Sequence, residues 1–252
     1  MYIWKTLKKY PKLKENLWNN KIWINKIEKR IKINLKSIKS KKEIKLNTFC
    51  AESPLPLLLL NQKKKIKILD FGSGSLEMPL KIIFDSKNDS TIEFFIVETR
   101  SLISLYKKLL KKIKLPKNFK INFNTNINFK IKYDYIHISD SFQYVVDWKD
   151  FLKKISKSKT NILIFNNLTA GEIPTYDTTQ KFYDIRIPYR FYNIRELINE
   201  LKDYKVIYKT KFLNKMLNEY SEYPQNNFKK KYRLGYPCTI IFKKLIDKDE
   251  KN

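Results

Sequence analysis

Two apolar runs, each closing on an acidic residue, constrain the fold of this chain most. The first covers residues 66–71 and contains Asp70, and a Gly-Ser-Gly turn follows it. The second covers residues 92–97 and leads into Glu98. Runs of this kind are typical of buried parallel strands. The whole chain has four glycines and two stand in this turn, which predicts a nucleoside site with Glu98 placed to hold a ribose.

Strand and helix patterns alternate after residue 62. The predicted strands cover residues 66–71, 92–97, 119–123, 133–139, 161–166, 204–210 and 238–243. The predicted helices cover residues 75–85, 100–114, 147–157 and 193–202. This order favours a doubly wound, mostly parallel seven-stranded α/β sheet. We expect the last two strands to pair antiparallel at the sheet edge.

The N-terminal part reads as a helical extension, residues 1–62, of a main domain at residues 63–245, with a charged tail at 246–252. Between Trp18 and Ile38 the apolar residues recur at spacings of three and four on a very basic segment, which predicts an amphipathic helix. Its apolar face can pack on the main domain or lie on an anionic membrane surface. Both alternatives stay open.

The formal net charge of +28 would favour a nucleic acid partner if the basic residues were clustered. Instead they are spread over the chain, and only six of the 53 are arginine. Lysine occurs beside abundant Ile, Asn, Phe and Tyr, which share A/T-rich codons. Genome composition therefore explains the charge more simply than a ligand, and nucleic acid is not the expected partner.

The two cysteines, Cys50 and Cys238, match no metal-ligand or disulfide spacing, which favours a reducing cytoplasm and no bound metal. The N-terminus lacks the apolar core of a signal peptide. The longest apolar run, residues 55–60, is interrupted by Pro56 and is too short to span a bilayer. We expect a soluble protein.

The turn after the first strand departs from the dinucleotide fingerprint, because Glu77 stands where the third glycine belongs. It resembles instead the D-x-G-x-G motif of class I methyltransferases, which use S-adenosylmethionine. The matching residues are Asp70, Phe71, Gly72, Ser73 and Gly74. The resemblance implies that Asp70 orients the ammonium group of the cofactor and that the glycines admit its methionine and ribose part. Glu98 would then bind the two ribose hydroxyls.

The likeness continues through residues 133–148, 183–192 and 235–238. Together these segments resemble a little-characterised family of bacterial methyltransferases encoded among surface-polysaccharide genes. The resemblance implies O-methylation of a sugar or an activated sugar precursor. It also implies cofactor contacts from Thr99 and Ser139.

One part of the family pattern is missing. Relatives carry an acid near the end of the third strand to meet the adenine amine, whereas residues 121–127 hold none. We expect Asn124 to substitute through its side-chain amide, with Asn126 as the alternative.

The loop after the fourth strand lies nearest the methyl group in this fold. Asp140 is therefore the candidate general base for a hydroxyl acceptor, and Tyr144 is a candidate positioning group. Asp140 could equally cap the following helix. His137, the single histidine, lies inside an apolar run and is expected to be a satisfied core residue.

Arginines and tyrosines gather after the fifth strand, where this fold often builds its substrate wall. The candidate substrate-binding residues are Tyr183, Arg186, Tyr189 and Arg190. Guanidinium groups bind phosphate or carboxylate, and aromatic faces stack on sugars or bases. The alternative is a surface helix entry with packed tyrosines.

The sequence thus predicts an S-adenosylmethionine-dependent methyltransferase with a small-molecule or glycan acceptor, phosphorylated or nucleotide-linked. An RNA methyltransferase that uses the lysine-rich surface would instead show steeply salt-dependent RNA binding. A non-catalytic relative would keep the fold without cofactor affinity or turnover.

Overall fold

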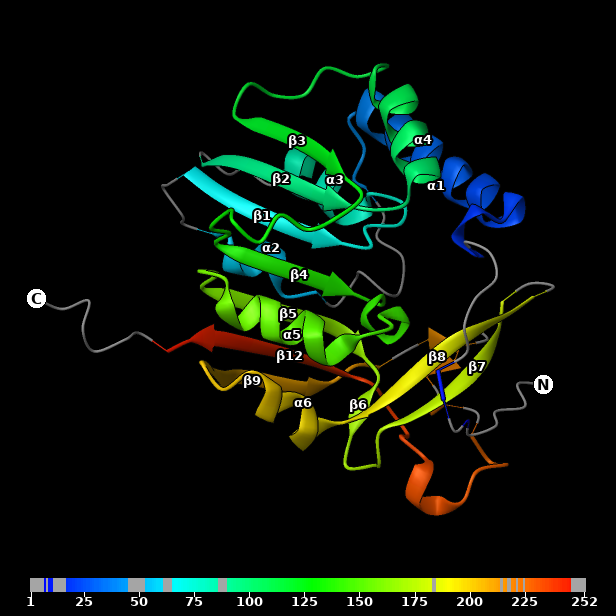
Figure 1. Cartoon of the computed structure of the whole chain (residues 1–252). Coiled ribbons are helices and arrows are strands. Elements are labelled where there is room, and N and C mark those ends of the chain that lie inside the picture. The colour runs from blue at the N-terminus through cyan, green and yellow to red at the C-terminus, as the bar shows by residue number, and fades with distance from the viewer. Residues whose placement is uncertain are drawn as a thin grey trace, which may run out of the picture.

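The computed structural model describes residues 7, 9–10, 17–44, 53–60, 65–85, 90–182, 185–213, 215–216, 219–220, 222–223 and 225–245. At its centre is a seven-stranded sheet with the order β3-β2-β1-β4-β5-β12-β9 (Figure 1). The strands are β1 (Lys65–Phe71), β2 (Thr91–Val97), β3 (Phe119–Asn124), β4 (Tyr135–Ser139), β5 (Ile162–Leu168), β9 (Tyr204–Lys211) and β12 (Cys238–Lys244). The first five run parallel, and β12 runs antiparallel to β5 and to β9. The doubly wound sheet and its antiparallel edge pair are confirmed.

Helices cover both faces of the sheet (Figure 1). One face carries α1 (Lys21–Lys39), α2 (Leu55–Leu58), α3 (Glu77–Asp85) and α4 (Arg100–Leu110), and the other carries α5 (Trp148–Lys157) and α6 (Ile194–Glu200). Short 3-10 turns occur at η1 (Leu17–Asn19), η2 (Phe142–Tyr144) and η3 (Lys230–Tyr232). Along β2, Phe94 and Ile96 pack in the α1–α4 layer, whereas Phe95 and Val97 pack in the α5–α6 layer. Burial on both faces explains why this strand is an unbroken apolar run.

Helix α1 belongs to the same core as the sheet. Asn20 caps it by accepting hydrogen bonds from backbone N–H groups of the first turn. Its apolar stripe of Ile27, Ile31 and Leu35 is buried in the layer that holds α3 and α4. The alternative in which this stripe lies on a membrane is therefore wrong. Over the ranges that the structure describes, no helix has the length and apolar character needed to cross a bilayer.

A second, smaller sheet, which sequence analysis missed, extends past the carboxyl ends of β4 and β5 (Figure 1). It has the order β6-β8-β7 and consists of β6 (Ala170–Gly171), β7 (Tyr176–Phe182) and β8 (Ile185–Asn193). A two-stranded ribbon, β10 (Lys215–Met216) and β11 (Glu219–Tyr220), follows later in the chain. On β8, Pro188 pairs with β7, while β6 reaches only Tyr192 and Asn193. Pro188 thus stands where one side of β8 is a free edge, a position that tolerates proline.

Candidate active site

The carboxyl ends of β1, β2 and β4 border one cavity of about 1020 Å³. Its walls come from the turn after β1, the start of α4, the loop after β4, helix α1 and the tip of β7. The structure brings nine of the predicted residues together here. They are Phe71, Gly72, Ser73, Gly74, Glu98, Thr99, Ser139, Asp140 and Tyr144.

The two glycines of the turn serve different needs. Both have positive φ, +71° at Gly72 and +56° at Gly74, where other residues are strained. A Cβ on Gly72 would lie 2.5 Å from the Cβ of Ser141, whose hydroxyl donates to the Phe71 carbonyl at 2.8 Å. A Cβ on Gly74 would meet nothing within 4 Å. Gly72 therefore lets β1 and the β4 loop close together, and Gly74 leaves room on the cavity wall.

Glu98 ties the end of β2 to this turn. Its carboxylate accepts hydrogen bonds from the N–H of Gly74 at 2.9 Å and from the N–H of Thr99 at 3.0 Å. Tyr106 donates its hydroxyl to the carbonyl of Gly74 on the same turn. Burial raises the pKa of Glu98 to about 7, against the opposing effect of the two N–H donors. The side chain thus changes charge near neutral pH.

Two hydroxyls of the cavity wall lack hydrogen-bond partners. Within the part of the chain that the structure describes, the side-chain oxygens of Ser73 and Thr99 are buried and unpaired. Thr99 precedes α4 without capping it through its side chain. Because unpaired buried hydroxyls are unfavourable, their presence beside Glu98 indicates a place for a polar ligand.

Asp140 lies on the cavity wall, and its carboxyl group is buried. It stands at a φ of 49°, a left-handed conformation that aspartate tolerates better than most residues. Gln143 donates its side-chain N–H to Oδ1 of Asp140 at 2.7 Å. Burial raises the pKa of Asp140 to about 7. The capping alternative is wrong, because Asp147 caps α5 and η2 has no side-chain cap.

Tyr144 lies beside Asp140 on the cavity wall. Its hydroxyl donates to Oε1 of Gln180 on β7 at 3.0 Å, and its ring meets Trp18 edge to face with the centroids 4.8 Å apart. Burial, with the nearby charge of Asp140, holds the pKa of Tyr144 well above its usual range. Tyr144 therefore stays protonated and cannot act as a base, and because its proton goes to Gln180, its oxygen is left to accept a hydrogen bond.

The structure corrects the expected role of Asp70. Its carboxylate is buried and lies 2.7 Å from Nδ1 of His137, whose Nε2 lies 2.9 Å from the hydroxyl of Ser53. The cavity lining does not include Asp70. It therefore holds the core of β1 and β4 together instead of meeting an ammonium group. The prediction that His137 is a satisfied core residue is confirmed.

Asn124, the residue expected to meet the adenine amine, does not lie on the cavity wall. Asn124 is exposed at the end of β3, and its carbonyl accepts the N–H of Glu98 at 3.0 Å. It does not line the cavity, whereas Thr125 and Asn126 do. Asn126, the alternative from the sequence, is therefore the better candidate.

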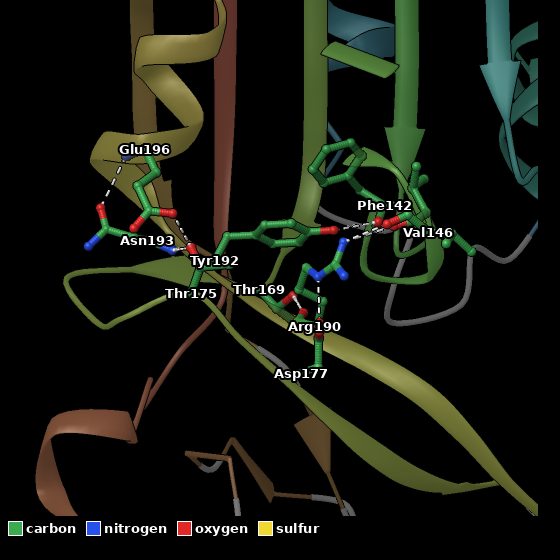
Figure 2. Close-up of polar contacts among 10 residues, drawn as sticks. Phe142, Val146, Thr169, Thr175, Asp177, Arg190, Tyr192, Asn193 and Glu196 are labelled. Carbon is green, nitrogen blue, oxygen red and sulfur yellow. Dashed lines mark hydrogen bonds and ion pairs between the residues drawn. The ribbon is translucent and has the colours of Figure 1, made fainter. Parts of the chain in front are cut away.

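The Arg190 side chain makes its hydrogen bonds to other parts of the protein (Figure 2). Its Nε donates to Oδ1 of Asp177 at 2.5 Å, and its Nη1 donates to the carbonyls of Val146 at 2.9 Å and Val145 at 3.3 Å. Tyr192, two residues on, donates to the Phe142 carbonyl at 2.8 Å. These contacts bind β8 to η2 and the segment after it. Arg190 does not line the cavity, so the expected substrate contact is replaced by a structural one.

Two further predicted substrate residues, Arg186 and Tyr189, also lie away from the cavity. Arg186 is exposed on β8, and its Nη1 donates to the hydroxyl of Thr179 at 3.4 Å. Tyr189 is buried behind Tyr144. Neither contributes to the cavity lining. Tyr183 lies outside the described residues.

Sequence reasoning missed most of one cavity wall. The missed lining residues include Trp18, Trp23, Lys26, Arg30, Arg100, Thr125, Gln180 and Lys181. On α1, Trp23, Lys26 and Arg30 follow at spacings of three and four, so they share one helical face. A search for polar as well as apolar stripes would have found this face, but nothing local says what it faces.

No protein-family model matches this sequence, and no curated protein matches it. Among solved structures, a chain from the Haloferax volcanii complex of the Trm112 methyltransferase activator aligns with a TM-score of 0.50 and 9% identity, covering 88% of this chain and 97% of that chain. An S-adenosylmethionine-dependent methyltransferase of Clostridium acetobutylicum ATCC 824 aligns with a TM-score of 0.47 and 17% identity, covering 85% and 97%. The cyclase SpnF aligns with a TM-score of 0.49 and 11% identity, covering 89% and 96%. Together with the sheet order, the first likeness shows that this chain has the Rossmann-like fold of class I methyltransferases.

Proposed function

We propose that this chain is a class I S-adenosylmethionine-dependent methyltransferase. The observation that carries the proposal is the contact between Glu98 and the N–H of Gly74. It brings a carboxylate and a glycine turn together on one cavity at the carboxyl ends of parallel strands. In open α/β sheets, ligands bind at this edge. A fold alone does not fix a reaction, so the proposal depends on these side chains.

The polar groups of the cavity fit a nucleoside with an amino-acid tail. The carboxylate of Glu98 accepts two backbone N–H groups and keeps further acceptor capacity for ribose hydroxyls. The unpaired hydroxyls of Ser73 and Thr99 can bond to the same ligand. Asn126 offers an amide to a purine edge. When bound, the cofactor supplies a methyl carbon that its sulfonium makes electrophilic.

Asp140, which lines the cavity, would take the proton that a hydroxyl acceptor loses. A pKa of about 7 is near the optimum for a general base at neutral pH. Tyr144, whose single proton is donated to Gln180, would orient the acceptor by accepting a hydrogen bond from it. This pairing of an ionisable base with a fixed hydroxyl oxygen suits transfer to oxygen.

We further propose that the acceptor is a small molecule or glycan, namely a sugar or an activated sugar precursor of surface-polysaccharide synthesis in the cytoplasm. Support comes from the sequence resemblance of residues 133–148 and 183–192 and from the neutral-range base. The cavity is large enough for a cofactor and a small acceptor together.

Equilibrium dialysis with labelled S-adenosylmethionine tests the cofactor assignment. Glu98→Gln should weaken binding about tenfold or more, because a charged acceptor of hydrogen bonds contributes roughly 1.5–3 kcal/mol. Glu93→Gln is the matched control. Glu93 lies on the same strand, pairs with Lys120 and Asn122 and does not line the cavity. Equal affinity of Glu98→Gln and wild type would remove Glu98 from the site.

A further inference from the structure

We infer that helix α1 and the start of α4 form an anion-binding subsite on the cavity wall, and that the methyl acceptor is a small phosphorylated molecule. The inference rests on the proposed function, whose acceptor it specifies. It relocates anion recognition from Arg186 and Arg190, which lie outside the cavity lining, to Arg30 and Arg100, which are part of it.

The geometry of α1 aims a set of side chains at the cavity. Trp23, Lys26, Ile27 and Arg30 all line it, and their spacings of three, one and three residues place them on one helical face. The neighbouring stripe of Ile27 and Ile31 is buried in the core. Burial of that stripe fixes the rotation of the helix, so the cationic face is held against the cavity.

The charges of the lining are unbalanced. Over the described residues, four cations line the cavity, Lys26, Arg30, Arg100 and Lys181, together with two acids, Glu98 and Asp140. Both acids are partly neutral near pH 7 because burial raises each pKa to about 7. S-adenosylmethionine carries a sulfonium, an ammonium and one carboxylate, so it adds net positive charge. The cofactor therefore adds to the positive charge that Arg30, Arg100 and Lys181 bring to the described part of the cavity wall, and an anionic acceptor would balance it.

Arg30 and Arg100 also differ from the arginines that the fold uses for itself. Arg190 and Arg233 donate to backbone carbonyls, and Arg195 pairs with Glu172 at 3.2 Å. Over the described ranges, Arg30 and Arg100 pair with no carboxylate. A guanidinium group matches phosphate through two parallel hydrogen bonds, which lysine does not provide.

Aromatic rings stand beside these cations. Trp18 meets Trp23 and Tyr144 edge to face, with centroid distances of 5.8 and 4.8 Å. All three rings line the cavity, and the hydroxyl of Tyr144 is held by Gln180. Aromatic surface next to an anion subsite suits a ring-bearing phosphate such as a sugar phosphate.

Calorimetric titration of the protein saturated with S-adenosylhomocysteine tests this inference, with glucose 1-phosphate as the probe and glucose as the uncharged comparison. We expect wild type to bind glucose 1-phosphate and not glucose. Arg30→Gln and Arg100→Gln should each weaken that binding about tenfold or more, the loss expected for one charged hydrogen bond. Their affinity for S-adenosylhomocysteine should stay near that of wild type. Arg195→Gln, which removes the same charge from the exposed surface, is the matched control and should bind like wild type.

Three results would overturn the inference. One is equal loss in Arg195→Gln, which would indicate diffuse attraction by net charge. Another is displacement of S-adenosylhomocysteine by glucose 1-phosphate, which would assign these arginines to the cofactor carboxylate. The third is no binding of glucose 1-phosphate together with steeply salt-dependent binding of a short oligoribonucleotide, which would point to nucleic acid. If S-adenosylhomocysteine itself fails to bind, the proposed function fails separately, and Arg30-dependent binding of glucose 1-phosphate by the free protein would still support the subsite.

Discussion

Glu98 makes cofactor binding depend on pH. Burial raises its pKa to about 7 in the free protein, and ribose hydroxyls that donate to the carboxylate would favour the ionised form and lower that pKa. Binding then releases a proton below neutrality. We predict that affinity for S-adenosylhomocysteine falls toward about tenfold per pH unit below about pH 7 and levels off above it. Titrations between about pH 6 and about pH 8 measure this slope.

The Glu98→Gln variant is the control for that slope. Its amide does not titrate, so its weaker affinity should be nearly constant over the same range. A slope that persists in Glu98→Gln would assign the linked proton to another group of the cavity, with Asp140 the first candidate.

The buried carboxyl of Asp140 is predicted to lower the free energy of unfolding once it is ionised. Its pKa is raised from 3.8 to about 7 in the folded state, so protonation favours folding and the free energy of unfolding falls as pH rises across that interval. Asp140→Asn keeps an oxygen for Gln143 and suits the positive φ. We expect its Tm to exceed that of wild type at about pH 8 and to match it at about pH 4, as measured by differential scanning calorimetry.

The same variant should lose turnover. Without the base, methyl transfer to a hydroxyl acceptor should fall by about 10² to 10⁴-fold while cofactor affinity persists. A variant with wild-type turnover, or one less stable than wild type above neutral pH, would contradict the role given to Asp140.

At the scale of elements, Arg190 holds the β7–β8 hairpin to the segment that follows η2. The Arg190 side chain is nearly buried and binds Asp177 and two carbonyls of the segment after η2. Arg190→Ala would leave these acceptors unpaired. We predict a loss of about 3–5 kcal/mol in the free energy of unfolding, measured by urea denaturation. Arg190→Lys should recover little of it, because an ammonium group cannot make the forked contacts.

If Arg190 bound the substrate, its variants would show the opposite pattern of effects on stability and turnover. Stability would then be nearly unchanged, and only acceptor turnover would fall. Arg186→Ala provides the comparison, since Arg186 is exposed on the same strand and should affect stability by no more than about 0.5 kcal/mol.

The central elements could be predicted from the sequence because the hydrophobic periodicity of an element and the residues that end it are both local signals. The predicted strand at 92–97 differs from β2 by one residue, and the predicted helix at 147–157 differs from α5 by one. The β7–β8 hairpin was missed because residues 183–192 were assigned to a substrate wall or a surface helix entry, not to a strand. Yet the buried residues Ile187, Tyr189 and Phe191 stand at every second position, and Tyr189 and Phe191 share one core cluster, which is a strand pattern.

At the scale of the whole molecule, the candidate site divides into a local and a distant part. The turn with Gly72 and Gly74 and the strand end at Glu98 carry their own sequence signal, and the structure places all three on the cavity. Asp70 carries the same signal but faces His137, because its place on β1 turns it toward the layer of α1 to α4. The α1 wall comes from packing between segments far apart in the chain. No local pattern predicts which face of a helix will border a cavity.

The net charge of +28 also belongs to the whole molecule. Ion pairs that join a lysine to an acid are few among the residues that the structure describes. Salt therefore weakens any general attraction of anions more than it weakens contacts inside the cavity. Comparing two salt concentrations separates the two contributions in every titration described above.

The most direct test of the account is calorimetric titration of the wild-type protein with S-adenosylhomocysteine at about pH 8, with NAD as the control ligand. The account predicts one saturable site for S-adenosylhomocysteine and no measurable binding of NAD, because Glu77 replaces the third glycine of a dinucleotide turn. Absence of S-adenosylhomocysteine binding, or equal binding of NAD, would contradict it.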